Sequence, residues 1–147
     1  MKVYLDTTII TILLFEQTLQ SARYGEVKQL FAQLDAGRLQ AVVSLYALQE
    51  LCAYCYSNFP AEQAPRVTRL ACHELLSHEL LLFPLLSRMD RIVLNRRFPM
   101  SDTSDQAHTA TAYHAGCTAI ITYDHHYQEV AGQIAVLTAG EVVARLA

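Results

Sequence analysis

Short apolar runs alternate with longer amphipathic stretches along almost the whole chain. The apolar runs have the length of buried strands, and we predict strands near residues 3–5, 39–43, 80–83, 119–122 and 134–137. In the stretches between them, apolar residues recur every three or four positions, which predicts helices near residues 9–15, 21–37, 44–58, 64–77, 87–97, 105–115 and 141–146. Strands that alternate with helices favour a parallel sheet covered on both faces. The predicted fold class is therefore α/β, a three-layer α/β/α sandwich with a central parallel sheet.

The size of the chain suits one domain, and we predict a single domain over residues 1–147. Hydrophobic residues make up 52% and charged residues 17%, which is enough apolar material for a core and argues against long disordered stretches. The longest apolar patch, residues 75–86, is interrupted by polar residues and Pro84, so it is not a membrane span. The first residues lack the apolar region and cleavage site of a secretory signal. We therefore expect a cytoplasmic protein without a membrane anchor.

The four cysteines offer a zinc or redox site that must be weighed. Cys52 and Cys55 form a C-x-x-C on one face of a predicted helix, and the other two are Cys72 and Cys117. No second pair of ligands follows at a suitable spacing, and thiols remain reduced in a cytoplasmic protein. We therefore predict buried thiols that pack in the core rather than a zinc half-site or a redox pair.

Acidic side chains follow the ends of predicted strands. Asp6 comes directly after the first strand, and Asp124 comes two residues after the fourth. The carboxyl ends of parallel strands meet at one edge of the sheet, where ligands usually bind. Glu50 lies about two turns into the helix that follows the second strand, and Asp105 lies in the first turn of the helix before the fourth. All four carboxylates could therefore reach the same edge.

Several carboxylates at one site repel each other unless a cation lies between them, so crowding should raise the pKa of at least one. The hard divalent ions Mg²⁺ and Mn²⁺ prefer such oxygen ligands. With these ions bound, a water can attack a phosphodiester without any nucleophilic side chain. Each acid alone also has a structural explanation, as a helix cap, a dipole partner, a turn residue or a solvated helix residue. The joint arrangement favours the metal site.

Four segments of the sequence resemble the motifs of PIN-domain ribonucleases and occur in the order of that family. They are VYLDTTII at 3–10, SLYALQEL at 44–51, SDQAHTATA at 104–112 and IITYDHHY at 120–127. Within the family, the resemblance is greatest to VapC-type toxins and their relatives. Two departures are visible: Tyr127 stands where Phe is commoner, and Gln106 and Ala107 replace the usual small and apolar pair.

The resemblance implies a PIN-like α/β/α fold and a divalent-metal-dependent endoribonuclease that uses Mg²⁺ or Mn²⁺ and a metal-activated water. By motif position, the catalytic and metal-binding residues are Asp6, Glu50, Asp105 and Asp124. Residues that could support them are Asp102, Thr7 and Thr122. Asp102 is an extra acid, and it could also compete with Asp105 for the metal. The resemblance further implies an RNA substrate, a homodimer and, for a toxin, an antitoxin protein.

Self-association is also indicated by an excess of apolar residues in two predicted helices. These residues are Leu13, Leu14, Phe15, Tyr46, Tyr54 and Tyr56.

Three histidines lie within the same motifs. His108 follows Asp105 by three residues, and we expect it to pack in the helix and form a hydrogen bond rather than take part in catalysis. His125 and His126 follow Asp124 and could act as a proton shuttle, but a histidine pair in a loop is more often solvated. We therefore expect these two side chains to be exposed.

The net charge of −3 gives no overall attraction to nucleic acid, so an RNA site must be local. Phosphate contacts with basic side chains provide most of the affinity for RNA. Arginines cluster on the predicted helix just before the acidic motif: Arg88, Arg91, Arg96 and Arg97. Arg66 and Arg69 form a second pair one turn apart. These residues are RNA-binding candidates, with a solvated basic face as the alternative.

Other functions fit the sequence less well. A phosphatase with an aspartate nucleophile needs a second acid two residues after the first, where Thr8 stands. A dinucleotide-binding enzyme needs a glycine-rich turn after the first strand, and the five glycines all lie elsewhere. The remaining alternative is a catalytically inactive PIN-like module that binds RNA or protein. Retention of all four acids argues against it.

Overall fold

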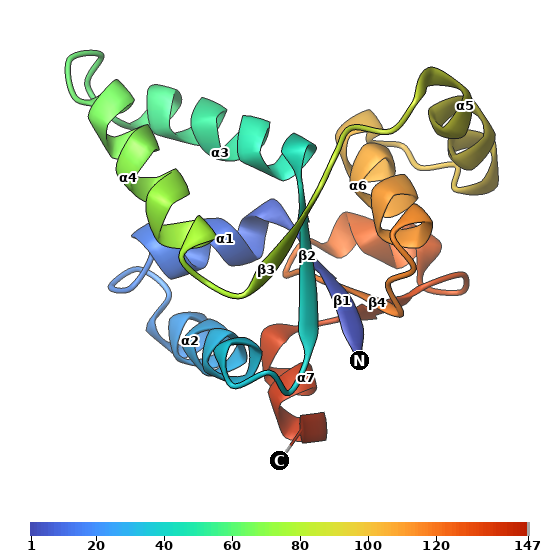
Figure 1. The fold of residues 1–147 in the computed structure, drawn as a ribbon, viewed down its shortest axis with the longest axis horizontal. Helices are drawn as coiled ribbons and strands as arrows, with labels where there is room; N and C mark the ends of the chain where they lie inside the picture. The colour runs from blue at the N-terminus through green and yellow to red at the C-terminus, as the bar shows by residue number, and fades with distance from the viewer. Residues whose placement is uncertain (147) are drawn as a thin grey trace.

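The computed structural model describes residues 1–146, in which helices surround a parallel sheet (Figure 1). The five strands are β1 (Lys2–Leu5), β2 (Gln40–Ser44), β3 (Leu80–Phe83), β4 (Ala119–Ile121) and β5 (Ala135–Leu137). They lie in the order β3-β2-β1-β4-β5, and each neighbouring pair is parallel. All five carboxyl ends therefore reach the same edge of the sheet, which is where ligands bind in open α/β folds.

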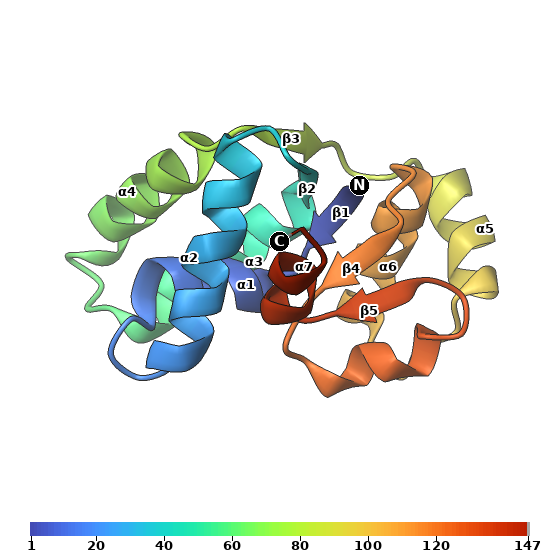
Figure 2. The same cartoon turned by 90° about the horizontal axis from the view of Figure 1, so that it is seen from below.

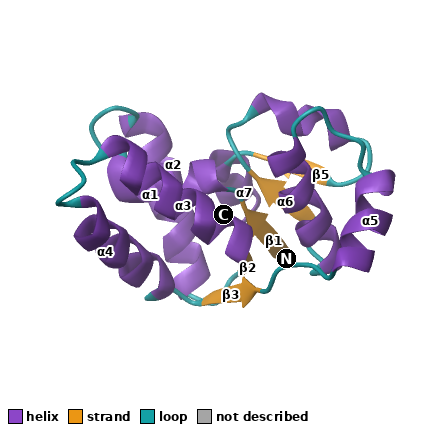
Figure 3. Cartoon of the chain, turned by 90° about the horizontal axis from the view of Figure 1, so that it is seen from above, coloured by secondary structure: helices purple, strands orange, loops and turns teal. Residues whose placement is uncertain are grey.

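Alternating side chains of the central strand explain why both faces of the sheet are covered. Val3 and Leu5 of β1 belong to one buried cluster and Tyr4 belongs to the other, because successive strand residues point to opposite faces. The first cluster is completed by α1 (Thr7–Phe15), α2 (Ser21–Asp35), α3 (Leu45–Asn58), α4 (Ala64–Leu76) and α7 (Ala139–Leu146). The second is completed by α5 (Arg88–Arg97), α6 (Thr103–His114) and the 3-10 helix η1 (His125–Val130). Figures 2 and 3 show the resulting layers, which confirm the predicted α/β/α sandwich.

Every predicted strand and helix is present, with boundaries shifted by a few residues. The helix predicted from residue 105 begins two residues earlier, because Asp102 caps it by accepting hydrogen bonds from the backbone N–H groups of Ser104 and Asp105 (2.7 and 3.3 Å). The 3-10 helix η1 was not predicted. Asp124 caps η1 by accepting from the backbone N–H of His126 at 2.9 Å. Two acids at the sheet edge thus also serve as helix caps.

The cysteines are free thiols, as predicted. Cys55 and Cys117 are buried, and Cys52 and Cys72 are half-buried. Burial raises the pKa of the Cys117 thiol to about 11, so it stays protonated and unreactive. Across residues 1–146 no helix combines the length and apolar character that a membrane crossing requires.

The apolar surface lies elsewhere than the sequence indicated. Leu13, Leu14 and Phe15 pack against the core, and Phe15 stacks on Tyr54 with ring centroids 5.2 Å apart. Of the six residues predicted to form an interface, only Tyr56 is exposed. Large exposed apolar residues are instead frequent between residues 81 and 93, on edge strand β3, on α5 and in the segment between them: Leu81, Leu82, Leu85, Met89, Ile92 and Val93. The first set is less exposed than predicted because contacts between elements far apart in sequence partly cover it: Phe15 of α1 lies against Tyr54 of α3, and Tyr46 lies against His108 of α6.

Candidate active site

Asp6 lies at the carboxyl end of β1 and caps α1, with only 4% of its surface exposed. One carboxylate oxygen, Oδ2, accepts hydrogen bonds from the hydroxyls of Thr8 (2.7 Å) and Thr122 (2.8 Å). The other, Oδ1, accepts from the hydroxyl of Tyr127 at 2.9 Å. Burial beside Asp6 raises the pKa of the Tyr127 hydroxyl far above its usual range, so this group remains a donor. Side chains from three segments therefore fix the orientation of Asp6.

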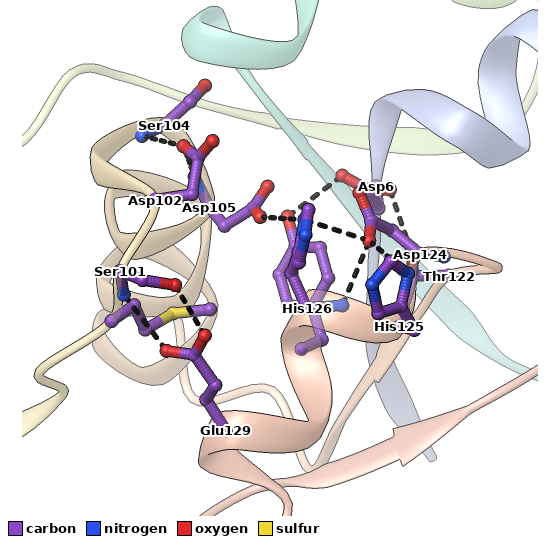
Figure 4. Close-up of polar contacts among 12 residues, drawn as sticks. Asp6, Ser101, Asp102, Ser104, Asp105, Thr122, Asp124, His125, His126 and Glu129 are labelled. Carbon is purple, nitrogen blue, oxygen red and sulfur yellow. Dashed lines mark hydrogen bonds and ion pairs between the residues drawn. The ribbon is translucent and has the colours of Figure 1, made fainter.

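Asp105 points from the first turn of α6 toward Asp6 and His126 (Figure 4). Burial of this carboxyl and the negative charges of Asp102, Asp124 and Asp6 raise its pKa to about 6. The charge of His108 lowers this pKa but does not outweigh those effects. The expectation that crowding raises the pKa of at least one carboxyl is therefore met at Asp105.

Glu50, from the second turn of α3, has partners of its own. Its carboxylate accepts hydrogen bonds from the hydroxyls of Thr7 and Ser104, and its Oε2 lies 3.0 Å from His108 Nε2. The two atoms of the His108 contact are at ion-pair distance without the alignment of a hydrogen bond. Burial alone raises the pKa of Glu50, but His108 and the two hydroxyls have the larger opposite effect, so the pKa falls to about 2. Glu50 is therefore ionised, with Thr7, Ser104 and His108 as its partners.

Behind Glu50 lies a buried chain of polar side chains that the sequence did not reveal. His108 Nδ1 is 2.5 Å from the Tyr4 hydroxyl, which is 2.6 Å from the Ser44 hydroxyl. Ser44 also caps α3 by accepting a hydrogen bond from the backbone N–H of Ala47. Burial lowers the pKa of His108, but the adjacent Glu50 carboxylate raises it overall. The predicted packing role of His108 is confirmed, and its partner Tyr4 could have been suspected only because a buried tyrosine hydroxyl needs a partner.

The two histidines after Asp124 differ in their surroundings. His125 is largely solvated, with 86% of its side chain exposed, as we expected. His126 is also exposed, as expected, with 46% of its side chain accessible, but its Nδ1 lies 3.2 Å from Asp124 Oδ1 and 3.7 Å from Asp105 Oδ2 (Figure 4). Within residues 1–146, Asp124, His125 and His126 are also the one group whose possible metal-ligating atoms all lie within 4.8 Å of one another. The unpredicted helix η1 creates this arrangement.

The charge balance of the site fits a divalent cation. In the part of the chain that the structure describes, every ion pair joins a carboxylate to a histidine, and none involves a lysine or arginine. Asp6, Asp105 and Asp124 therefore bring negative charges together with little compensation, which the raised pKa of Asp105 reflects. Carboxylate oxygens in such an arrangement are the donors that hard divalent ions prefer.

The supporting residues predicted from sequence take distinct places. Thr122 contacts Asp6, and Thr7 contacts Glu50. Asp102 does not point at the other acids but stays at the start of α6, where it acts as the helix cap (Figure 4). Its charge still contributes to the raised pKa of Asp105. The sequence missed Thr8, Ser104 and the hydroxyl of Tyr127.

The four arginines of α5 do not share one environment. Arg91 lines a cavity beside Glu50. The guanidinium of Arg97 instead lies over the Tyr113 ring, 4.3 Å from its centroid. All four arginines are exposed. Arg91 is therefore the member of this group that is placed beside the acidic site.

Comparison with known proteins identifies the family of this chain. The sequence matches the profile of the PIN domain over residues 2–126. The chain belongs to the PIN-domain family. At the level of the family, this membership supports a nuclease, which is a hydrolase. No curated protein matches the sequence.

Solved structures of VapC toxins and VapBC complexes share the fold of this PIN-domain protein. VapBC2 from Rickettsia felis, bound to a DNA fragment from its promoter, superposes with a TM-score of 0.66 at 14% identity over 94% of this chain and 98% of that chain. DNA-bound VapBC from Salmonella typhimurium gives 0.64 at 18% identity over 95% and 98%. The sarcin–ricin-loop-cleaving toxin VapC20 from Mycobacterium tuberculosis gives 0.63 at 15% identity over 90% and 95%.

Proposed function

We propose that this PIN-domain protein is a divalent-metal-dependent endoribonuclease. The observation that carries the proposal is the placement of Asp6, Asp105 and Asp124 around one sheet edge, where no lysine or arginine among residues 1–146 forms an ion pair with them. A structural role would not require this arrangement, because like charges at one site destabilise the metal-free fold. Glu50 joins them as a fourth carboxylate that is already held in place by its own partners.

In the proposed mechanism, Asp6, Asp105, Asp124 and Glu50 hold Mg²⁺ or Mn²⁺. The bound cation would supply a nucleophilic water and stabilise charge on the phosphate oxygens. Asp6 presents its carboxylate in one orientation because Thr8, Thr122 and Tyr127 hold both oxygens. Glu50 stays ionised at any physiological pH, since its pKa is about 2.

Asp105 and His126 must adjust when the cation enters. With a pKa of about 6, Asp105 is partly protonated in mildly acidic solution and would release that proton on binding the cation. His126 lies within 4 Å of Asp105 and Asp124, so it would turn away or bind the cation through its ring nitrogen.

The direct test is cleavage of labelled single-stranded RNA by the purified chain. We expect cleavage with Mg²⁺ or Mn²⁺ and none after chelation by EDTA. Ca²⁺ should bind but support little turnover, because its larger and looser coordination positions the water poorly. Full activity in excess EDTA would rule out the metal mechanism.

We further propose that the protein is the toxin of a toxin–antitoxin pair and acts on cytoplasmic RNA as a homodimer. Support comes from the shared fold with VapC toxins, several of which were solved as complexes with a VapB partner. Induction of the wild-type chain in a bacterial host should arrest growth, and induction of Asp6→Asn should not. A short upstream reading frame whose product restores growth would identify the antitoxin. Normal growth under strong induction of folded wild-type protein would contradict the toxin proposal.

A further inference from the structure

A cavity of about 630 Å³ opens beside Glu50, between helices α3, α5 and α6. Glu50 and Ser104 lie on its wall, so the cavity adjoins the carboxylate site directly. Its volume falls within the range of about 300–1,000 Å³ that sites for small ligands occupy. Tyr46, Arg91 and Asn95 also lie on its wall, and none of them forms a hydrogen bond or ion pair with the described aspartates of the site. Their placement in the cavity therefore points to a role other than orienting these carboxylates.

Two polar groups on this wall lack a partner among residues 1–146. Arg91 extends from α5 and forms no ion pair with any described carboxylate. The amide oxygen of Asn95, one turn further along α5, is buried and accepts no hydrogen bond. An unpaired buried acceptor is unfavourable, so the cavity is suited to a ligand that donates a hydrogen bond at this point.

An aromatic ring completes the wall. Tyr46, from the first turn of α3, is half-buried, and its ring meets His108 edge-on with centroids 6.3 Å apart. A guanidinium group binds phosphate, an aromatic ring stacks on a nucleobase, and an amide forms hydrogen bonds with the edge of a base. A nucleotide offers a partner to all three groups at once: a phosphate for Arg91, a base face for Tyr46 and a base edge for Asn95.

We propose that this cavity binds the base and one phosphate of an unpaired nucleotide next to the phosphodiester that is cleaved. Arg91 contacts the phosphate, Tyr46 stacks on the base, and Asn95 accepts a hydrogen bond from the base edge. The inference rests on the proposed ribonuclease function and adds to it a preference for single-stranded RNA with selected bases, since unstacked bases are what proteins read in RNA. An acidic peptide would pair with Arg91 but would leave the ring of Tyr46 and the buried Asn95 oxygen unused.

The test measures binding rather than cleavage, so that it can fail independently of the proposed function. The parent protein is Asp6→Asn in EDTA, which keeps the RNA intact. Affinities for labelled oligonucleotides of A, C, G and U are measured by fluorescence anisotropy for Tyr46→Leu, Asn95→Leu and Arg91→Gln. Matched controls lie outside the cavity on the same helices: Tyr56→Leu on α3 and Arg96→Gln on α5. A thermal melt checks that each variant is folded.

We expect Tyr46→Leu to weaken binding roughly tenfold, as loss of one stacked base does, while Tyr46→Phe restores it. Asn95→Leu should change the order of preference among the four bases, and Arg91→Gln should weaken binding to all four equally. The controls should have smaller effects. If Tyr46→Leu and folded Asn95→Leu keep the affinities and base order of the parent, the proposal is overturned, and the cavity is left to a protein ligand. Should Asn95→Leu not fold, the result with Tyr46→Leu decides.

Discussion

Asp105 and Glu50 are carboxylates at the same edge of the sheet, yet their surroundings shift their pKa values in opposite directions. Burial and three neighbouring aspartates raise the pKa of Asp105 to about 6. Glu50 is also partly buried, but His108 and two hydroxyls lower its pKa to about 2. The difference indicates a division of roles at the scale of single residues. In the proposed mechanism, Glu50 is held by its own partners before a cation binds, whereas Asp105 would gain its compensating charge from the cation.

Replacing Asp105 by Asn should stabilise the metal-free protein. A folded-state pKa above the ordinary value of 3.8 means that the native state binds more protons than the unfolded state between pH 3.8 and about 6. Wild-type stability therefore falls as the pH rises through that window, and the variant should lack this contribution. At pH 7 in EDTA we expect the variant to melt about 3 °C higher, the shift that roughly 1 kcal/mol produces in a domain of this size.

The same melts with Mn²⁺ test whether Asp105 holds the cation. Mn²⁺ should raise the melting temperature of the wild type more than that of Asp105→Asn, because fewer ligands bind the cation more weakly. If Asp105→Asn is less stable than the wild type in EDTA, the carboxylate of Asp105 instead makes a structural hydrogen bond in the native protein. If Mn²⁺ stabilises both proteins equally, Asp105 is not a ligand of the cation.

Loss of the Tyr4 hydroxyl should destabilise the fold. Tyr4→Phe leaves Ser44 and His108 buried without their shared partner, which costs about 1–3 kcal/mol of unfolding free energy. Urea denaturation measures this difference. Tyr56→Phe, at an exposed position of α3, is the matched control and should change stability by less than about 0.5 kcal/mol. Equal stability of the two variants would show that the buried chain of hydroxyls contributes nothing.

At the scale of elements, helix starts determine where the acids lie. Asp6, Asp102 and Asp124 each cap a helix, and so each is held where a strand or loop meets that helix. The caps formed by Ser44 and Ser87 were predictable, because a hydroxyl residue stands directly before an amphipathic run. Helix η1 was not predicted, because its six residues offer only one apolar pair at helical spacing, Tyr127 and Val130, and so short a pattern does not distinguish a helix from a loop.

Two variants of Asp102 can distinguish a helix-capping role from a metal-binding role. Asn caps a helix about as well as Asp, so Asp102→Asn should keep both stability and RNA cleavage. Asp102→Ala removes the acceptor for two backbone N–H groups and should lose about 1 kcal/mol of unfolding free energy. Stability is measured by urea denaturation, and cleavage with Mn²⁺. A large loss of cleavage in folded Asp102→Asn would make Asp102 a metal ligand and reverse its assignment.

At the scale of the whole molecule, the alternation of strands and helices was sufficient to predict a parallel sheet with helices on both faces. It also placed Asp6 and Asp124 at one edge, since both lie just beyond the carboxyl ends of predicted strands. The order of the strands and the contacts behind the site could not be predicted in this way. Tyr4 meets Ser44 across 40 residues and His108 across 104, and periodicity carries no information on such distant pairs.

The exposed apolar surface on β3 and α5 predicts self-association of the whole molecule. At protein concentrations on the order of tens of micromolar, we expect sedimentation velocity to show a dimer. Val93→Lys on α5 should shift the protein to monomer, because a charge cannot be buried in an apolar contact without a partner. Leu19→Lys, at a residue that is 82% exposed elsewhere on the surface, should leave the dimer intact. A monomeric wild type would contradict the homodimer proposal.

The most direct test of the central claim compares RNA cleavage in Mn²⁺ by the wild type and by single charge-removing variants of the proposed ligands. These are Asp6→Asn, Glu50→Gln, Asp105→Asn and Asp124→Asn. We expect each folded variant to lose at least about a hundredfold in rate, since residues that merely support a metal site cost about 10- to 100-fold. Undiminished cleavage by Asp6→Asn, or by the wild type in EDTA, would contradict a metal-dependent ribonuclease at this edge of the sheet.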